Sequence, residues 1–201
     1  DIGFTPQEGG YDLEGILEGA SSGDVKSVFL LGADELDMSC LGDSFVVYVG
    51  THGDAGAHRA DVILPGATYT EKQAIYVNTE GRAQMTEQAA FPPGEAREDW
   101  KIFRALSEVL GEKLPYDNVE TLRALMFEVA PHLAGLDELT DAGAPDVSAL
   151  TINASLSDAP FMNNAQDFYF TNPIARASKI MAECSIQAQS RNVSEGTGTD
   201  G

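Results

Sequence analysis

The stretch that decides the fold runs from Ser44 to Glu71 and reads SFVVYVGTHGDAGAHRADVILPGATYTE. It opens with an apolar run, residues 45–49, that is closed by Gly50. A turn rich in Gly and His follows, and a second apolar run, residues 61–64, ends at Pro65, which supplies no donor to a β-ladder. Near-continuous apolarity over so few residues predicts strands that are buried on both faces of a parallel sheet.

A third apolar run precedes this stretch, at residues 25–31, and is closed by Gly32. Three such strands, spaced by roughly a dozen residues, are typical of a doubly wound sheet. Downstream, residues 76–84 read YVNTEGRAQ and place an Asn-Thr-Glu-Gly-Arg turn between apolar positions. The sequence therefore predicts an α/β fold with a partial doubly wound parallel sheet.

Two helices are predicted after the sheet. The first spans residues 98–110 and should bury an apolar stripe, with Gly111 placed to end it. That stripe consists of Trp100, Phe103, Leu106 and Leu110. The second should begin at a capping pair, Asp117 with Glu120, and stop before Pro131. Its apolar face consists of Val119, Leu122, Leu125, Met126 and Val129.

The remainder of the chain differs in composition and in periodicity. Residues 135–167 are polar and aperiodic, which indicates an extended segment that is ordered only on a surface. Asn172 and Pro173 then place a cap and a first-turn proline before a short helix. We expect the segment to dock on a neighbouring surface, because a free linker would not normally carry so many aromatic residues. These are Phe161, Phe168, Tyr169 and Phe170.

Composition excludes several classes of function. The 32 acidic and 12 basic residues give a formal charge of -20, which repels nucleic acid and anionic lipid headgroups. No apolar run approaches the roughly 18–20 residues that cross a bilayer, so we expect no direct membrane insertion. Cys40 and Cys184 are too few for a disulfide framework or a cysteine-ligated cluster, and should be small buried hydrophobes. The opening at Asp1 shows no secretory signal, which suggests an internal piece of a longer protein.

Several patterns look chemical but have simpler interpretations. Residues 19–23, GASSG, have the letters of a nucleophile elbow, but the strand follows them instead of preceding them, so an ordinary loop is expected. Four metal-type side chains crowd the turn after residue 50, yet their spacing matches no strong template, and a turn needs such residues to fold and to cap the next segment. They are His52, Asp54, His58 and Asp61.

A second polar group surrounds the Glu-Gly-Arg turn. Such a group can buttress a cofactor, but we favour a network that locks loops together by charge-assisted hydrogen bonds. It consists of Glu71, Asn78, Glu80 and Arg82. His132 lies at a predicted helix end, where it favours a C-terminal cap. We therefore predict no catalytic, cofactor-binding or metal-binding residue in this chain.

The block from Gly50 to Gln84 resembles the C-terminal part of the molybdopterin-oxidoreductase fold, and more narrowly the family of large iron–sulfur subunits of respiratory complex I, the NADH-quinone oxidoreductase. Further matching segments extend the resemblance over most of the chain. They are residues 92–101, 104–107, 114–117, 167–169, 173–178 and 181–182. The element from Asp167 to Ala182 is the more specific part, because generic molybdopterin enzymes do not share it.

The resemblance implies a cofactor-free structural domain of a subunit that passes electrons from NADH toward quinone. The 2Fe-2S and 4Fe-4S clusters of that subunit would lie outside this chain, and the ancestral pterin site would be empty. Implied partners are the N-terminal iron–sulfur part of the same subunit and other subunits of the hydrophilic arm. The implied location is peripheral, on the cytoplasmic side of a bacterial inner membrane or the matrix side of the mitochondrial inner membrane.

Two alternatives remain open at this stage. One is a fragment of an active molybdopterin enzyme such as a formate dehydrogenase, and the other is a free-standing acidic protein-binding module. For the domain organisation we expect an α/β domain, a docking segment, a short helix and a disordered tail. Their predicted bounds are residues 1–131, 132–172, 173–190 and 191–201.

Overall fold

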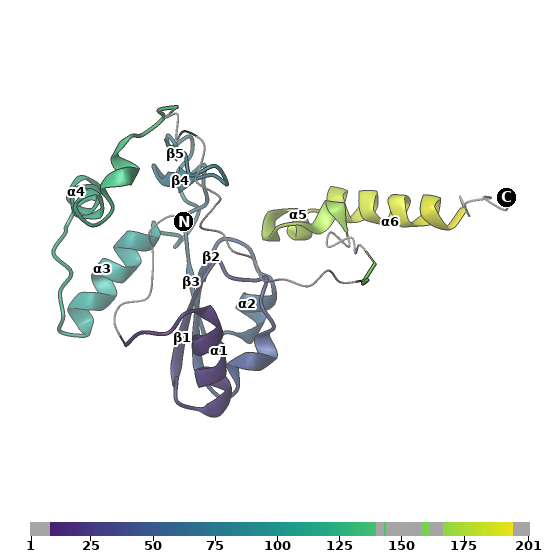
Figure 1. Cartoon of the computed structure of the whole chain (residues 1–201), viewed down its shortest axis with the longest axis horizontal. Coiled ribbons are helices and arrows are strands. Elements are labelled where there is room, and N and C mark those ends of the chain that lie inside the picture. The colour runs from purple at the N-terminus through teal and green to yellow at the C-terminus, as the bar shows by residue number, and fades with distance from the viewer. Residues whose placement is uncertain (1–8, 140–142, 144–157, 161–166, 195–201) are drawn as a thin grey trace. The chain divides into compact units, whose positions relative to one another are not determined.

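The computed structural model describes residues 9–139, 143, 158–160 and 167–194 (Figure 1). The chain divides into two compact units, Asp1–Glu138 and Leu139–Gly201, which are considered separately below. Within the described residues, no helix combines the length and the apolarity that a bilayer crossing requires.

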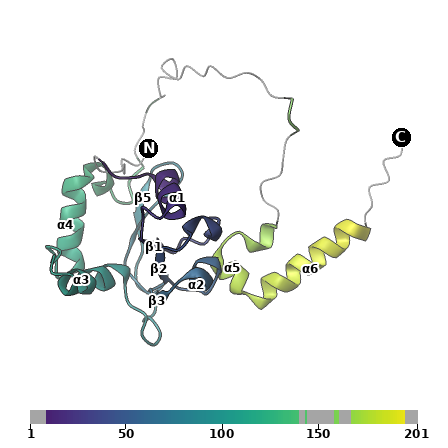
Figure 2. The same cartoon turned by 90° about the horizontal axis from the view of Figure 1, so that it is seen from below.

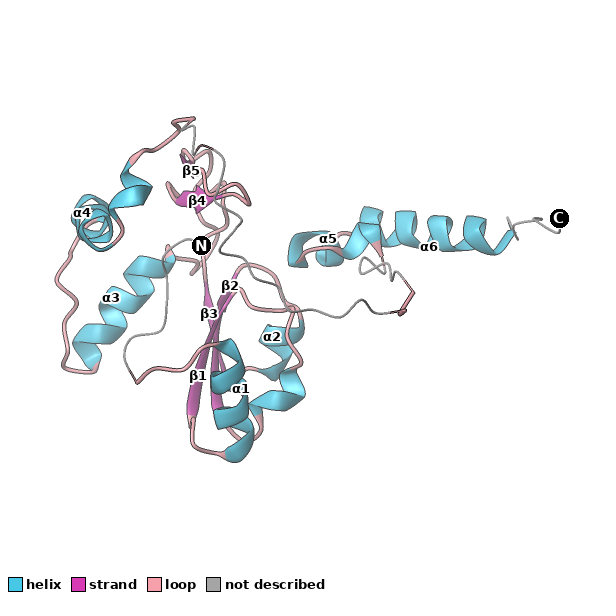
Figure 3. Cartoon of the chain, viewed as in Figure 1, coloured by secondary structure: helices cyan, strands magenta, loops and turns pink. Residues whose placement is uncertain are grey.

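A three-stranded parallel sheet forms the centre of the first unit (Figure 3). Its strands are β1 (Ser27–Leu31), β2 (Phe45–Gly50) and β3 (Val62–Pro65), in the order β1-β2-β3. The three strands predicted at residues 25–31, 45–49 and 61–64 are confirmed. The prediction of an α/β fold with a parallel sheet is also confirmed. Strands in parallel sheets are usually apolar because other elements of the fold cover the sheet.

One face of this sheet carries the core. It is covered by α1 (Leu13–Ser22), the 3₁₀ turn η1 (Met38–Leu41) and α2 (Ala55–Arg59), and Figure 2 shows α1 and α2 on the same side. The buried residues of this cluster are Ala20, Val28, Leu30, Leu41, Val46 and Tyr48.

The expectation of an ordinary loop at residues 19–23 is wrong, because these residues end helix α1. Asp12 caps the helix by accepting a hydrogen bond from the Gly15 amide at 2.9 Å. Gly19 lets the helix approach the chain that enters β1, since a Cβ there would lie 2.8 Å from Val25 Cγ2. Gly23 ends the helix with φ 88°. The two glycines and two serines, which favour loops in isolation, serve close packing and capping here.

The opposite face of the sheet is only partly covered, so the prediction of burial on both faces is wrong for β1 and β3. Val47 and Val49 of β2 are buried there, but Phe29 is 43% exposed and Leu31 is 60% exposed. Helix α3 (Asp99–Val109) approaches this face through Phe103, whose ring centroid lies 6.0 Å from that of Phe29. Figures 1 and 2 place α3 on the side away from α1.

Helix α3 ends as predicted but buries less than predicted. Gly111, at φ 85°, donates to the Glu108 carbonyl, and Glu112 donates to the Ser107 carbonyl, which is the Schellman arrangement. Trp100 is only half-buried, and Leu110 is 70% exposed. The apolar stripe of α3 therefore lines a surface instead of filling the core among the described residues.

The N-cap of helix α4 (Val119–Val129) lies one residue after the predicted one. Asn118, not Asp117, accepts the hydrogen bond from the Thr121 amide, at 2.8 Å. Asp117 is held by Arg104 instead, at 2.6 and 2.9 Å. The helix stops before Pro131 as predicted, and the 3₁₀ turn η2 (Pro131–Ala134) follows.

A small hairpin completes the first unit. Strands β4 (Ile75–Val77) and β5 (Ala83–Met85) are antiparallel, and the Asn-Thr-Glu-Gly-Arg sequence forms their turn. Asp137, which has φ 62°, docks on this hairpin: its amide donates to the Ala83 carbonyl at 2.8 Å, and its carbonyl accepts from Arg82 Nη2 at 3.3 Å.

The second unit contains η4 (Phe168–Phe170), α5 (Pro173–Ala177) and α6 (Lys179–Ser194). Asn172 caps α5, and Pro173 stands in its first turn, as predicted. The single short helix expected at 173–190 is interrupted at Ser178, whose ψ of 121° is not helical, and α6 continues to Ser194. Most of the predicted docking segment, including Phe161, and the final residues lie outside the described residues.

Asp167 holds the second unit together. It accepts hydrogen bonds from the Tyr169 amide at 2.9 Å and from the Ser185 hydroxyl of α6. Ser185 is buried and also lies 3.3 Å from Gln189 Nε2. Arg176 of α5 donates to the Phe170 carbonyl at 2.8 Å. One carboxylate and one guanidinium therefore fasten η4 to both helices.

Candidate functional site

Open α/β sheets usually bind ligands at the carboxyl ends of their strands, which here are the ends of β1 and β2. Asp34, two residues after Gly32, is buried and accepts hydrogen bonds from the Tyr48 hydroxyl and the Gly56 amide, each at 2.8 Å. Gly56 must lack a side chain, since a Cβ would lie 2.8 Å from both the Ala33 carbonyl oxygen and the Tyr48 ring. The arrangement joins the loop after β1 to β2 and α2, and it leaves no room for a side chain at Gly56.

Sequence reasoning missed Asp34. A lone Asp shortly after a strand looks like an ordinary turn residue. The available signal was the tyrosine in β2, because a buried tyrosine hydroxyl needs a partner.

The four metal-type residues of the following turn have separate positions. His52 is half-buried, and its Nδ1 lies 2.8 Å from Thr51 Oγ1. Asp54 precedes α2, and His58 lies in its last turn. Asp61 accepts a hydrogen bond from the Val46 amide at 2.7 Å. Among the described residues, no group of three or more His, Cys, Asp or Glu side chains could hold a metal ion.

Most contacts of the polar group around the hairpin turn are local, but Arg82 Nη2 also donates to the Asp137 carbonyl at 3.3 Å. Asn78 Oδ1 accepts from the amides of Glu80 and Arg82, at 3.0 and 2.9 Å, and so shapes the turn. Glu71 accepts from the Thr68 amide at 3.0 Å. Glu80 is exposed, and in the part of the chain that the structure describes no hydrogen bond or ion pair joins it to His52. The four residues organise two separate turns and do not form one network.

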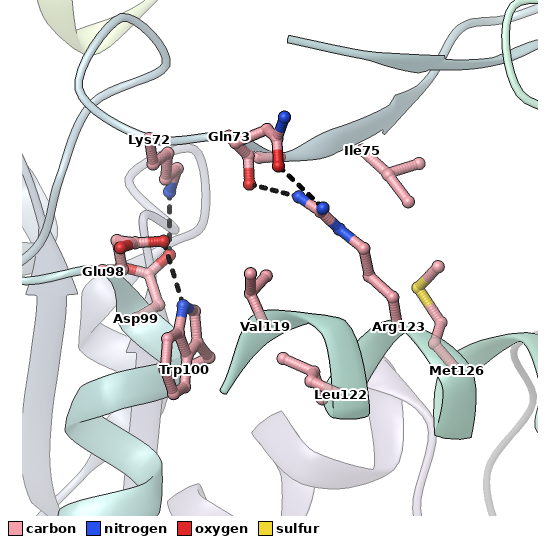
Figure 4. Close-up of a pocket in the computed structure, with 11 residues that line it drawn as sticks. Lys72, Gln73, Ile75, Glu98, Asp99, Trp100, Val119, Leu122, Arg123 and Met126 are labelled. Carbon is pink, nitrogen blue, oxygen red and sulfur yellow. Dashed lines mark hydrogen bonds and ion pairs between the residues drawn. The ribbon is translucent and has the colours of Figure 1, made fainter. Parts of the chain in front are cut away.

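A groove between α3, α4 and the start of β4 brings together several charged side chains and Trp100 (Figure 4). Lys72 Nζ lies 3.1 Å from Asp99 Oδ2. Trp100 Nε1 donates to Glu98 Oε2 at 2.9 Å, and Arg123 donates to the side chain and carbonyl of Gln73 at 2.7 and 2.9 Å. Val119, Leu122 and Met126 supply the apolar wall.

The charged side chains of this groove are paired with groups of opposite charge or with hydrogen-bond partners. Partial burial raises the pKa of the Glu98 carboxyl, but hydrogen bonds from Lys101 and Trp100 and the charges of Lys101 and Lys72 outweigh it. The pKa of Glu98 therefore lies below its ordinary value. Lys101 Nζ also lies 5.2 Å from the Trp100 ring centroid, which is a cation–π distance.

An ion pair between Arg104 and Asp117 also links α3 to the chain before α4. A hydrogen bond to Glu108, followed by the contacts with Asp117, raises the pKa of Arg104. The hydrogen bond from Arg104 lowers the pKa of Asp117.

The groove at Trp100 is too small for a large cofactor. The groove at Trp100 encloses about 190 Å³, below the roughly 300–1,000 Å³ of ordinary ligand pockets. A cluster held by four thiolates needs more than Cys40 and Cys184, which are both free and half-buried instead of fully buried as predicted. His132 lies in η2 just after α4, at the helix end where the sequence placed it. The prediction that no residue here is catalytic or binds a cofactor or metal stays a prediction.

The comparisons with known proteins agree with this architecture. The family model described as molybdopterin oxidoreductase matches residues 1–109, and the chain belongs to that family. A second model, described as the C-terminal part of a subunit of NADH-ubiquinone oxidoreductase, matches residues 138–184. The second match covers the element from Asp167 to Ala182 that the sequence singled out as the more specific signal.

Individual relatives are similar over most of the chain. The 78 kDa subunit of mitochondrial NADH-ubiquinone oxidoreductase from Candida albicans is 50% identical over 79% of the chain. The 75 kDa subunit from Reclinomonas americana is 48% identical over 79%. The mitochondrial NADH dehydrogenase [ubiquinone] iron-sulfur protein 1 from Solanum tuberosum is 45% identical over 92%. The chain spans only 23%, 23% and 24% of these relatives.

Proposed function

We propose that this chain is a cofactor-free structural domain of the iron–sulfur subunit of a proton-translocating NADH:ubiquinone oxidoreductase. The observation that carries the proposal is the family match at residues 138–184, together with relatives at 45–50% identity whose names specify NADH-ubiquinone oxidoreductase or NADH dehydrogenase. These findings favour respiratory complex I over the formate dehydrogenase alternative.

In this proposal the parent subunit passes electrons from NADH toward quinone through 2Fe-2S and 4Fe-4S clusters outside the chain. One relative is named an iron-sulfur protein, and the two cysteines of this chain cannot supply four thiolate ligands. The partners are the N-terminal iron–sulfur part of the same subunit and other subunits of the hydrophilic arm. The domain is peripheral, on the matrix side of the mitochondrial inner membrane or the cytoplasmic side of a bacterial one.

A structural role suits the geometry of the first unit. Paired charges and local hydrogen bonds account for the polar groups at both candidate places. The partly covered face of the sheet offers apolar surface for packing, with Phe29 and Leu31 at its edge.

The test is metal and cofactor analysis of the parent protein in its native assembly. Iron, without stoichiometric molybdenum or extractable pterin, in a complex that oxidises NADH is the expected result. As a matched control, a Cys40→Ser/Cys184→Ser variant should keep all its iron, because neither thiol is a ligand. Stoichiometric molybdenum would overturn the proposal in favour of a molybdopterin enzyme, and loss of iron in the variant would place a cluster ligand in this chain.

A further inference from the structure

A loop with a fully presented phenylalanine precedes helix α3. Phe91 is 89% exposed, and the two prolines that follow it each fix one backbone dihedral angle. Before it, the amides of Ala89 and Ala90 both donate to the Thr70 carbonyl, at 2.8 and 3.0 Å. The loop is therefore held on both sides of Phe91, although the side chain of Phe91 buries little surface within the fold.

Two hollows lie beside this loop and share Glu98 in their linings. The first is the groove at Trp100 (Figure 4). The second encloses about 310 Å³ and is bordered by the Phe91 loop and the start of α3, with Arg97 and Lys101 in its lining. Because the two hollows share a residue, we treat them as one surface and call it the Trp100–Phe91 surface.

The Trp100–Phe91 surface carries an excess of positive charge. Its lining holds four basic side chains and two acidic ones, whereas the chain has a formal charge of -20. Glu95, which lies 3.6 Å from Arg97, is 89% exposed and lines neither hollow. Even with Glu95 counted, basic side chains outnumber acidic ones. The basic side chains are Lys72, Arg97, Lys101 and Arg123, and the acidic ones are Glu98 and Asp99.

The charge of Arg123 has no acidic counterpart among the described residues. Its guanidinium donates to the side chain and the carbonyl of Gln73, at 2.7 and 2.9 Å, and both of these acceptors are neutral. By contrast, Lys72 is paired with Asp99. A carboxylate from a partner would complete the environment of Arg123 at the wall of the groove (Figure 4).

The residue types of this surface are those that protein interfaces favour. Aromatic and arginine side chains are enriched at interfaces, and a small apolar pocket that receives one partner side chain is a common form of energetic hot spot. The surface holds two aromatic side chains and two arginines, Phe91 and Trp100 with Arg97 and Arg123. The groove at Trp100, at about 190 Å³, suits one side chain better than a whole small molecule.

We propose that the Trp100–Phe91 surface binds an acidic segment of another polypeptide. The segment places one large apolar side chain in the groove at Trp100 and its carboxylates beside Arg123 and Lys101, while Phe91 packs against it. Charge complementarity selects this occupant, because a basic or neutral segment leaves Arg123 without a counter-charge. The proposed function names partner subunits but no surface, and this inference does not depend on the redox activity of the parent protein.

The first test is photo-cross-linking in the native assembly of the full-length protein. The cross-linking amino acid replaces Gln88, which is exposed and lines the second hollow. The cross-link should lead to another polypeptide, in a segment that contains more Asp and Glu than Lys and Arg. A segment without an acidic excess, a segment of this same chain or the absence of any cross-link would each overturn the proposal.

A charge variant with a matched control tests the electrostatic part. Arg97→Gln and Lys113→Gln each remove one cation whose side chain is 54% or 55% exposed and that has one ion pair at the surface. Only Arg97 lines the Trp100–Phe91 surface. The yield of the Gln88 cross-link should fall at least about threefold in Arg97→Gln and stay unchanged in Lys113→Gln.

An apolar variant with a matched control tests the aromatic part. Phe91→Ala and Val109→Ala truncate side chains that are 89% and 83% exposed, so both variants should fold. The cross-link yield should fall at least about threefold in Phe91→Ala and stay unchanged in Val109→Ala, with melting temperatures unaltered in both. Equal yields in Phe91→Ala and Val109→Ala, or in the two charge variants, would contradict a partner at this surface.

Discussion

Asp34 connects three elements through two hydrogen bonds, and it does so as a buried carboxylate. Replacing it with Asn keeps the size but puts an amide group where one of the two acceptor oxygens stood. A buried hydrogen-bonding group that loses its partner costs about 1–3 kcal/mol. The contribution of this residue to stability is therefore large for a single loop side chain.

We expect Asp34→Asn to lower the free energy of unfolding by about 1–3 kcal/mol in urea titrations. Tyr48→Phe added to it should cost less than the sum of the two single changes, because both remove the same bond. The exposed Asp43→Asn is the control and should stay within about 0.5 kcal/mol of the unaltered protein. Additive losses would mean that Asp34 and Tyr48 act independently.

Trp100 is the second residue whose structure changes an expectation. Truncation of a fully buried tryptophan to Ala lowers the free energy of unfolding by about 3–5 kcal/mol. Trp100, however, is half-buried in a groove. We expect Trp100→Ala to lower the free energy of unfolding by about 1–3 kcal/mol, measured by circular dichroism in urea. Phe91→Ala, at a side chain that is 89% exposed, should change it by less than about 0.5 kcal/mol. A Trp100 loss above about 4 kcal/mol would restore the core assignment.

At the scale of elements, the N-terminus of α4 is decided by a shift of one residue. Asp117 and Asn118 are both good capping residues, and sequence spacing alone does not separate them. The structure separates them because Arg104, on the neighbouring helix, binds the Asp117 carboxylate and leaves the cap to Asn118. A contact distant in sequence therefore sets a local boundary.

Asn118→Ala should lower stability by about 0.5–2 kcal/mol and speed exchange of the Thr121 amide, which loses its acceptor. Asn118→Ser keeps a capping oxygen and should stay close to the unaltered protein. If Asp117→Ala exposes the Thr121 amide more than Asn118→Ala does, the cap is Asp117 after all.

The start of α3 should show a pH dependence. The pKa of Glu98 is lowered in the folded state, so its contribution is present above its unfolded pKa and is lost as pH falls through the folded value. We expect Glu98→Gln to lower the melting temperature at pH about 7 and to have no effect well below pH about 4, with a free-energy difference below about 1 kcal/mol.

Glu95 is the matched control for Glu98. Its side chain is 89% exposed, and it pairs with Arg97 only at 3.6 Å. The melting temperature of Glu95→Gln should follow that of the unaltered protein at every pH. A Glu98→Gln difference that persists in acid would exclude the ion pair as its cause.

For the whole molecule, the three parallel strands and the α/β class could be predicted, because short apolar runs closed by Gly or Pro are local features. Helix α1 could not be predicted, since its Gly19 and Gly23 suggest a loop until Val25 is seen to pack against the helix. The prediction that both faces of the sheet are buried is wrong at β1, where Phe29 and Leu31 are exposed. Burial of these side chains depends on which other elements cover them, and the sequence of the strand does not contain that information. The residues around Glu80 were expected to form one network that locks loops together, but Asn78 and Glu71 shape separate turns. Asp34 was visible only through its tertiary contacts.

The strand order β1-β2-β3 also bears on the order in which the polypeptide is made. Synthesis proceeds from the N-terminus, at about 5–20 residues per second, so β1 leaves the ribosome before β2, and β2 leaves before β3. Each new strand therefore emerges next to the strand that it pairs with in the folded sheet. The last of the three to arrive, β3, ends in Pro65, which has no N–H with which to pair a further strand.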